Sequence, residues 1–326
     1  MNRPTPTAIG AIALAALALT GCSSSGTKAA STPAASTSAA ATFPVTEDST
    51  TVTAKPTHIV SLSATATDML FTIGAGSQVV AVDTNSDFFK GCSTLKLACT
   101  DPTTTPPNKL DSYKPNVEAI AADNPDLVVI SDDQNKIQEQ LVALKIPVYV
   151  APAATSINDT YSQMTALGAL TGNVSGAAAA VAAEKAAIST TLASLKPRTK
   201  PLSYYYELDQ TYYSVTSKTF IGSLFTMANM INIADPADSS GKAGGYPQLS
   251  AEVIIKANPD TIFLADTVCC KQSAATVAAR PGWSTLTAVK QNQIVPLNDD
   301  VASEWGSQVP SLLTQIVTES NAIPAS

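Results

Sequence analysis

The sequence predicts an α/β protein built from two similar lobes that one long helix joins. The first observation is residues 174–195, which are rich in alanine and contain no proline before Pro197. Alanine is the strongest helix former and proline the strongest helix breaker, so these residues should form a single helix. Residues 175–195 of this helix would span roughly 30 Å at 1.5 Å per residue.

The second observation is an internal repeat on either side of this helix. The tripeptide Asn124-Pro125-Asp126 recurs as Asn258-Pro259-Asp260, an offset of 258 − 124 = 134 residues. At the same offset Glu118 matches Glu252, and a short apolar run follows each tripeptide. A repeat on both sides of a long helix indicates two lobes of similar fold.

The third observation is the alternation of short apolar runs with helical patterns in both halves. The strands expected are 58–62, 79–82, 127–130, 147–150, 202–207, 231–233, 261–264 and 294–297. The helices expected are 66–74, 116–123, 136–144, 220–228, 251–257 and 310–319. This alternation predicts mostly parallel sheets, and hence two Rossmann-like lobes. Ligands bind at the carboxyl ends of such strands, which places a ligand cleft between the lobes.

The amino-terminal segment has the pattern of a lipoprotein signal peptide over residues 1–21. An apolar run at 8–19 is too short to span a bilayer. It leads to Leu19-Thr20-Gly21-Cys22, which resembles a lipobox, so we expect a lipid on Cys22. The alternative is an ordinary cleaved signal peptide with a chance cysteine.

The remaining organisation follows from composition. Residues 22–54 are mostly Ser, Thr and Ala and should form a disordered tether. We assign the amino-terminal lobe to 55–172, the connecting helix to 173–197 and the carboxy-terminal lobe to 198–326. Without Arg3 the chain has 18 basic and 26 acidic residues, a net charge of 18 − 26 = −8. This balance argues against nucleic acid as a partner.

Several of these segments together resemble one protein family. Residues 56–83, both Asn-Pro-Asp repeats, Arg280-Pro281-Gly282-Trp283 and residues 298–306 are similar to the substrate-binding lipoproteins of iron-siderophore and cobalamin ABC importers. The resemblance implies a monomeric, non-enzymatic receptor, lipid-anchored on the outer face of the cell membrane. Such a receptor has no intrinsic cofactor, carries ferric iron only within a chelate, and delivers the chelate to an ABC permease.

Glu118 and Glu252 are the candidates for docking to the permease. Each lies in the first turn of an expected helix, where the helix dipole favours a carboxylate. That general preference would explain either glutamate alone, but it explains the symmetric pair less well. In the family, one glutamate of each lobe forms a salt bridge with the permease, and these two positions match that motif.

The ligand-binding candidates are aromatic and polar residues that follow the expected strands. Tyr204 and Tyr206 share one face of a strand and Tyr205 the other, so at least one side should be core packing. Aromatic faces suit a siderophore, corrin or haem, and we expect about half of the tyrosine rings to be packing only. The candidates are Ser63, Thr65, Asp83, Phe88, Tyr113, Asp132, Tyr206, Tyr212, Tyr213, Tyr246, Asp266, Glu304 and Trp305.

Four cysteines remain besides Cys22, and they allow three pairings. We favour Cys92 with Cys99, which closes a short loop, and hence a vicinal bridge between Cys269 and Cys270. The alternative is a zinc site, although thiolate ligands usually have wider spacing. We expect no direct protein ligand to a metal, although a tyrosine phenolate could bind ferric iron directly. The single histidine, His58, has no partner and is not expected to bind a metal.

Charge bears on the choice of ligand. A ferric tris-catecholate is strongly anionic and would need several arginines, but after residue 21 the chain has only Arg198 and Arg280. We therefore expect a ferric hydroxamate. Lysines at positions 90, 96, 109, 218, 242 and 271 leave the anionic ligand open. The alternatives are cobalamin or haem uptake, or a lipoprotein of the same fold that binds cell-envelope partners without transport.

Overall fold

The computed structural model describes residues 41–86 and 108–324 of the 326-residue chain. Its first lobe contains a five-stranded parallel sheet in the order β5-β4-β3-β6-β7. The strands are β3 (Ile59–Leu62), β4 (Val79–Asp83), β5 (Asn108–Leu110), β6 (Leu127–Ile130) and β7 (Val148–Val150). The sequence predicts all of them except β5, a polar edge strand that is largely exposed.

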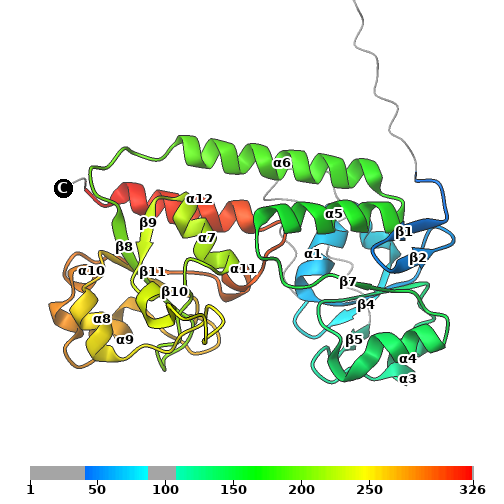
Figure 1. Ribbon diagram of the computed structural model, residues 1–326, viewed down its shortest axis with the longest axis horizontal. Coiled ribbons are helices and arrows are strands. Elements are labelled where there is room, and N and C mark those ends of the chain that lie inside the picture. Colours follow the sequence, from blue (N-terminus) through cyan, green and yellow to red (C-terminus); the bar gives the residue numbers. More distant parts are fainter. Residues whose placement is uncertain (1–40, 87–107, 325–326) are drawn as a thin grey trace, which may run out of the picture. The chain divides into compact units, whose positions relative to one another are not determined.

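Helices cover both faces of this sheet (Figure 1). They are α1 (Ala64–Thr72), α3 (Val117–Ala122), α4 (Ile137–Ala143) and α5 (Ile157–Thr171). Neighbouring residues of β3 enter different clusters, Ile59 with α1 and α5, and Val60 with α3 and α4. Because both faces are covered, a central strand such as β6 is apolar throughout.

The second lobe contains a four-stranded parallel sheet in the order β11-β10-β8-β9. Its strands are β8 (Leu202–Glu207), β9 (Met230–Asn232), β10 (Thr261–Leu264) and β11 (Ile294–Pro296). Its helices are α7 (Phe220–Met227), α8 (Ala251–Ala257), α9 (Ala274–Ala278), α10 (Thr287–Lys290), α11 (Asp299–Ser303) and α12 (Val309–Ala322). Short 3₁₀ turns lie at Gly76–Gln78, Gln134–Lys136, Asp235–Asp238 and Trp283–Thr285.

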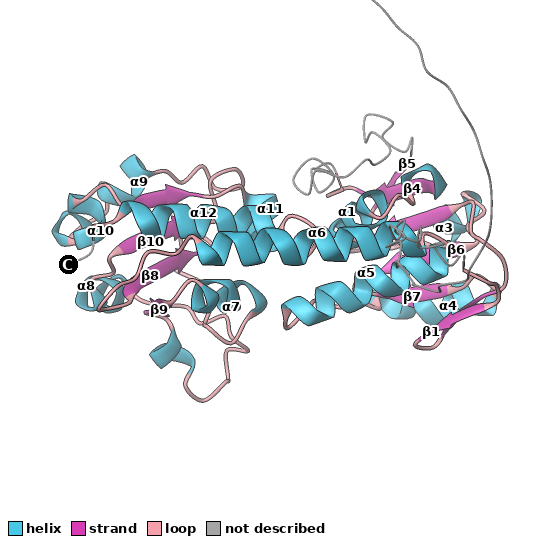
Figure 2. Ribbon diagram, turned by 90° about the horizontal axis from the view of Figure 1, so that it is seen from above, coloured by secondary structure: helices cyan, strands magenta, loops and turns pink. Residues whose placement is uncertain are grey.

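The predicted connecting helix is confirmed as α6 (Val174–Ala193). It packs against α5 and α1 of the first lobe and against α12 of the second, and it runs alongside both lobes in Figure 2. Its amino-terminal turn needs a glycine, because a Cβ on Gly176 would lie 2.0 Å from the carbonyl oxygen of Ile73. The two parallel sheets and this helix confirm the predicted fold class.

Helix α5 is missing from the sequence prediction, which assigns no element to residues 151–172. Its start is a capping box in which Ser156 and Asp159 each accept from the other's backbone N–H, and Gly172 ends it with a φ of 70°. A Ser-x-x-Asp pattern before a helical run is the signal that identifies such a start.

The predicted tether is wrong at its carboxyl end, because residues 45–52 form a hairpin. Strands β1 (Val45–Glu47) and β2 (Thr50–Val52) pair antiparallel. Val52 is buried in the cluster beneath α1 and α5, and the Thr50 hydroxyl donates to the Val148 carbonyl at 2.6 Å. A buried valine and a hydrogen-bonded threonine therefore attach this segment to the first lobe. Residues 1–40, with the predicted signal peptide and Cys22, lie outside the described residues.

Candidate functional site

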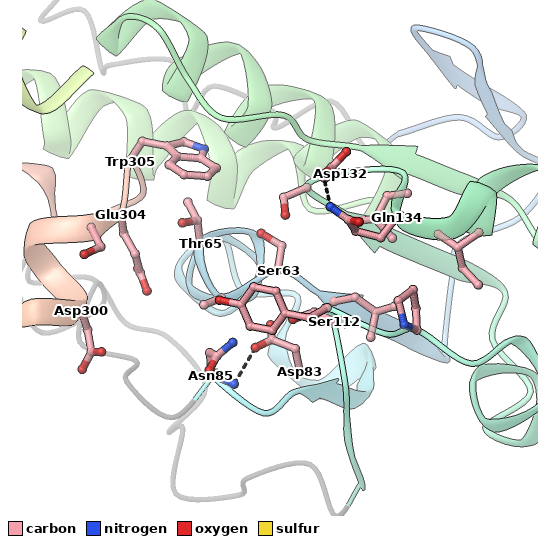
Figure 3. Close-up of a pocket in the computed structure, with 18 of the residues that line it drawn as sticks. Ser63, Thr65, Asp83, Asn85, Ser112, Asp132, Gln134, Asp300, Glu304 and Trp305 are labelled. Carbon is pink, nitrogen blue, oxygen red and sulfur yellow. Dashed lines mark hydrogen bonds between the residues drawn. The ribbon is translucent and has the colours of Figure 1, made fainter. Parts of the chain in front are cut away.

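A cavity of about 480 Å³ lies at the carboxyl ends of β3, β4 and β6 (Figure 3). One wall comes from the first lobe, from Leu62 to Thr65, Asp83, Asn85 and the segments 112–115 and 130–137. The other wall comes from the second lobe, from Asp299 of α11 to Trp305. Both lobes therefore contribute to one cavity at the sheet edge where the sequence places the ligand.

Ser63 and Asp83 form the floor of the first-lobe wall. The Ser63 hydroxyl caps α1 by accepting from the Ala66 N–H at 3.2 Å. The Asp83 carboxylate accepts from the Asn85 N–H at 2.6 Å and from the Ser86 hydroxyl at 2.8 Å. Burial nevertheless raises the pKa of Asp83, because these hydrogen bonds only partly offset the loss of water.

Asp132 and Tyr113 form the outer part of the same wall. The Asp132 carboxylate accepts from the Gln134 side-chain amide at 2.5 Å. Tyr113 is 73% exposed although its side chain lines the cavity. An exposed aromatic ring at the mouth of a cavity is free to stack on an incoming ligand.

Helix α11 carries the second-lobe wall. Asn298 caps this helix, and the Asp299 carboxylate accepts from the backbone N–H groups of Thr267, Val268 and Cys269, each at 2.9 Å. Burial acts to raise the pKa of Asp299, but these hydrogen bonds outweigh it and lower the pKa overall. Asp299 is thus a fixed negative charge that holds α11 in place.

Glu304 and Trp305 complete this wall. Glu304 is 9% exposed, and its Oε2 has no hydrogen-bond partner. Burial, and then the carboxyl groups of Asp68, Asp300 and Asp83, raise the pKa of Glu304 to about 8. Trp305 packs against the cores of both lobes, and its Nε1–H donates to Gln163 Oε1 at 3.2 Å.

Behind this wall lies a second group of buried carboxyls. Asp68 of α1 accepts from the Ser307 hydroxyl, and the Thr72 hydroxyl donates to Ser307 Oγ at 3.0 Å. Glu184 of α6 is fully buried, and neither of its carboxyl oxygens is hydrogen-bonded. Burial, and then Asp68, raise the pKa of Glu184 to about 8, so this group is mostly protonated at neutral pH.

The charge of the cavity is one-sided. Five of its lining residues are acidic: Asp83, Asp132, Asp299, Asp300 and Glu304. Among the residues that the structure describes, no lysine, arginine or histidine lines it. Lys109 acts on Asp83 only as a nearby positive charge. The described part of the chain also contains no cluster of three or more His, Cys, Asp or Glu side chains that could hold a metal ion.

The structure brings seven of the thirteen predicted ligand residues to this cavity: Ser63, Thr65, Asp83, Tyr113, Asp132, Glu304 and Trp305. Phe88 lies outside the described residues. The lining residues that the sequence reasoning missed include Asn85, Ser112, Gln134, Asp299, Asp300 and Ser303. Each lies within two residues of another lining residue or at the start of α11. Its position shortly after the end of a strand is therefore the feature of the sequence that could have identified it.

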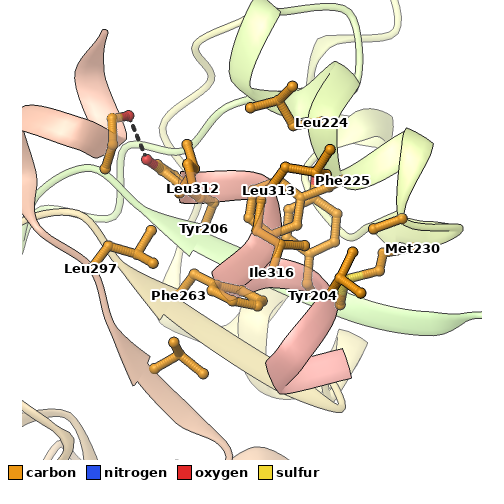
Figure 4. Close-up of a cluster of buried hydrophobic side chains, with 14 of the residues drawn as sticks. Tyr204, Tyr206, Leu224, Phe225, Met230, Phe263, Leu297, Leu312, Leu313 and Ile316 are labelled. Atoms are coloured by element: carbon orange, nitrogen blue, oxygen red, sulfur yellow. Dashed lines mark hydrogen bonds between the residues drawn. The ribbon is translucent and has the colours of Figure 1, made fainter. Parts of the chain in front are cut away.

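The prediction for Tyr206 is wrong, because this residue belongs to the core. Tyr204, Tyr205 and Tyr206 are all fully buried. Figure 4 shows Tyr204 and Tyr206 beside Phe225 and Phe263, and the Tyr206 hydroxyl donates to the Ala302 carbonyl at 2.8 Å. The sequence predicts core packing for at least one face of this strand, and the structure shows it for both faces.

Tyr212 and Asp266 are also misplaced by the prediction, because Arg280 fills the space at the ends of β8 and β10. The Arg280 guanidinium binds both oxygens of Glu207 at 2.6 Å and lies 4.6 Å from the ring centre of Trp283. Tyr212 stacks on Trp283, with 5.8 Å between ring centres, and does not line the cavity.

Asp266 is buried beside this ion pair, with its carboxyl group next to that of Glu207. Burial, and then the neighbouring Glu207 carboxylate, raise the pKa of Asp266 to about 7. Tyr213 and Tyr246 are on the surface, 41% and 50% exposed, and they do not line the cavity. The prediction that they contact ligand is not supported by their positions.

The predicted bridge between Cys269 and Cys270 is wrong, since both thiols are free. In this loop the Asp299 carboxylate accepts from the Cys269 N–H, and the backbone of Lys271 has a left-handed φ of 54°. Adjacent half-cystines would need a strained peptide link, and hydrogen bonds already hold the loop without one. Cys92 and Cys99 lie outside the described residues.

Glu118 and Glu252 occupy equivalent exposed positions in α3 and α8. Asn116 caps α3 and Ser250 caps α8, each by accepting a backbone N–H three residues on. The first-turn backbone N–H of Glu252 lowers the pKa of its own side chain. Both glutamates are therefore surface charges at helix starts, one on each lobe.

Comparison with known proteins places this chain among extracytoplasmic binding proteins. A family model described as periplasmic binding protein matches residues 59–301. An uncharacterized ABC transporter substrate-binding lipoprotein of Bacillus subtilis is 26% identical over 280 residues, which are 82% of each chain.

A cobalamin-binding protein of Halobacterium salinarum is 30% identical over 233 residues, which are 68% of this chain but only 58% of that protein. The structure of a possible iron-binding periplasmic solute-binding protein of Staphylococcus epidermidis superposes with a TM-score of 0.68 at 22% identity. It aligns 82% of this chain with 99% of that one. At this identity the superposition shows the shared fold alone.

Proposed function

Because this chain belongs to the periplasmic binding protein family, we propose that it is the solute-binding component of an ABC importer and captures a ferric hydroxamate siderophore between its lobes. The observation that carries this proposal is the cavity at the carboxyl ends of β3, β4 and β6, to which both lobes contribute. A solute-binding protein binds and releases its ligand unchanged, so the side chains of the cavity need only recognise the ligand.

The chemistry of the cavity supports a hydroxamate. The Ser63 and Thr65 hydroxyls and the Asn85 amide offer neutral hydrogen bonds, and the rings of Tyr113 and Trp305 offer apolar contact. In a ferric trihydroxamate the three hydroxamate anions neutralise the charge of the iron, so the chelate centre has no net charge and presents methylene chains to such a surface. Ferric catecholates and the two propionates of haem are anionic, and the five acidic lining residues disfavour both.

A corrinoid is the second candidate ligand. It is rich in neutral amides, which suit the same hydroxyl and carboxyl groups. The 30% identity to a cobalamin-binding protein favours it.

Trp305 provides the test of capture. The chain has two tryptophans, and Trp283 is fully buried in the second lobe, whereas Trp305 lines the cavity. In purified full-length protein, a ferric hydroxamate should quench the fluorescence of Trp305 saturably. The Trp305→Phe variant should lose this quenching, and the Trp283→Phe variant should retain it. Absence of quenching by hydroxamates and corrinoids in folded protein would contradict the proposal.

Glu118 and Glu252 would carry the delivery step by binding positive side chains of the permease. Replacing both by alanine should stop import while the affinity for ligand stays unchanged, because neither side chain lines the cavity. Uptake of the labelled chelate by cells and affinity of the purified protein are the two measurements. Glu139→Ala, an exposed first-turn glutamate of α4, is the matched control. Weakened binding by the double variant would refute the assignment.

Anchoring belongs to the same proposal. A lipid on Cys22 would hold the protein at the outer face of the cell membrane, next to the permease. No helix within residues 41–86 and 108–324 is long and apolar enough to span a membrane. A folded receptor that shows no transport phenotype would favour the alternative, a cell-envelope lipoprotein that binds other partners.

A further inference from the structure

We infer that the cavity selects chelates that carry a positive charge, and that Glu304 is the residue that determines this selectivity. The inference rests on the proposed function, which supplies the chelate but leaves its charge open. It concerns the second-lobe wall, where the residue after α11 meets the first lobe.

The position of Glu304 points to a partner on the ligand. Its backbone is extended, with φ −110° and ψ 158°, immediately after the last turn of α11. Figure 3 shows Glu304 beside Trp305 on the second-lobe wall of the cavity, across from Ser63 and Thr65 of the first lobe. Its Oε2 is buried without a hydrogen bond, which costs free energy in the empty protein. A donor on the ligand would remove that cost.

The surroundings of Glu304 decide which donor fits best. Carboxyl groups face it from three elements, Asp68 of α1, Asp83 at the end of β4 and Asp300 of α11. Beyond Asp68 lies the buried Glu184 of α6, another acid. Since no basic side chain of the described residues lines the cavity, a cation is attracted by the whole group and an anion is repelled by it.

Binding of such a cation should release a proton. Repulsion among these acids and burial favour the protonated form of Glu304 in the empty protein, with a pKa of about 8. An ammonium group on the ligand favours the carboxylate instead. The neutral carboxyl then gives its proton to solvent, and a carboxylate–ammonium pair replaces it. About one proton per cationic ligand should therefore leave the protein at pH 7.

A matched set of ligands tests the inference. A linear ferric trihydroxamate with a terminal ammonium group carries one positive charge, its N-acetyl form is neutral, and its N-succinyl form carries one negative charge. Titration calorimetry of the full-length protein, in two buffers that differ in ionisation enthalpy, gives both the affinity and the proton count. The cationic form should bind about tenfold more tightly than the neutral form, and the anionic form most weakly.

Variants separate the charge effect from the fold. Glu304→Gln keeps the shape of the side chain, and it should abolish both the preference for the cationic over the neutral chelate and the release of a proton. Glu139→Gln, on the surface of α4, should leave both readouts at their wild-type values. Equal affinity for all three chelates, or an unchanged preference in Glu304→Gln, would overturn the inference and leave the proposed receptor function intact.

A second pair of ligands keeps the two proposals distinguishable. If none of the hydroxamates binds, the hydroxamate assignment fails, and aquocobalamin, which is cationic, is compared with neutral cyanocobalamin. Preference for the aquo form that is lost in Glu304→Gln would support the inference for a corrinoid. Equal binding of the two forms, or no binding of either, would overturn it.

Discussion

The two lobes use the same device at the amino ends of their central strands. In the first lobe Asp126 accepts from the backbone N–H groups of Thr57 and His58, at 2.7 and 2.9 Å, where β3 begins. In the second lobe Asp260 accepts from the N–H and the hydroxyl of Ser203, both at 2.8 Å, at the start of β8. Each aspartate ends an Asn-Pro-Asp repeat, so the internal repeat reflects a framework of hydrogen bonds that both lobes share.

At the carboxyl ends of the same strands the lobes differ. The first lobe leaves Ser63, Asp83 and Asp132 facing the cavity. In the second lobe the corresponding space is filled by Arg280, which binds Glu207 and lies against Trp283. The framework is therefore duplicated, but the carboxyl ends of β3, β4 and β6 line the cavity whereas those of β8 and β10 are covered by Arg280.

Breaking the Arg280 contact should have the largest effect on stability. Arg280→Met leaves Glu207 buried and without its ion-pair partner, and loss of one member of a buried pair costs about 3–5 kcal/mol. Urea unfolding at pH 7 should show this loss in the free energy of unfolding. Adding Glu207→Gln should restore part of it, because no charge is then left buried.

Asp83→Asn is the comparison in the first lobe, because within the described residues no ion pair of Asp83 would be broken. It should cost about 1 kcal/mol. A loss below 1 kcal/mol in Arg280→Met would show that the second-lobe edge is not held by this pair.

Glu184 lies on the one helix common to both lobes, and it should make stability depend on pH. Its pKa is about 8 in the folded protein against 4.5 in the unfolded chain, so the folded state binds the extra proton between these values. Stability must then fall as pH rises through this window, by about 2–3 kcal/mol from pH 5 to pH 7.

Glu184→Gln should remove this contribution, so the variant gains stability over wild type as pH rises. Chemical denaturation at pH 5, 6 and 7 measures the difference. Glu118→Gln, which alters an exposed carboxyl, is the control. A difference between Glu184→Gln and wild type that stays constant with pH would contradict the assignment.

Replacing an exposed tyrosine should have the smallest effect, and comparing one tyrosine from each lobe tests which lobe contacts the ligand. Tyr113→Ala should weaken binding of the hydroxamate about twofold to twelvefold, since an aromatic contact contributes about 0.5–1.5 kcal/mol. Tyr246→Ala, a similarly exposed ring on the second lobe, should leave the affinity unchanged. Equal losses from both variants would mean that the second lobe contacts ligand beyond α11.

This asymmetry explains which predictions from sequence succeeded. The long helix and every strand of the two parallel sheets except β5 were predictable, because composition and the Asn-Pro-Asp repeat mark them locally. First-lobe residues such as Ser63 and Asp132 were found because the rule of strand ends applies there. The same rule failed for Asp266, since no pattern near β10 shows that Arg280, from a distant loop, covers the end of that strand. It failed for Tyr206 because its ring packs in the core of the second lobe.

Other features lacked a local signal or were overlooked. Helix α5 has its capping box, but the hydrophobic pattern of its sequence is too weak to predict a helix. The hairpin at residues 45–52 follows a low-complexity stretch, and its order comes from contact with Val148, which is distant in sequence. The loop that carries the free thiols of Cys269 and Cys270 is held by backbone hydrogen bonds to Asp299 that composition does not reveal.

The packing of α6 on α5 and α1 at one end and on α12 at the other fixes the spacing between the lobes. If Glu118 and Glu252 are the docking points, that spacing is nearly the same with and without cargo. Empty receptors would then occupy the permease almost as well as loaded ones. Uptake would be slowed by an excess of receptor over chelate, so the number of copies in the envelope becomes a quantity that the cell must regulate.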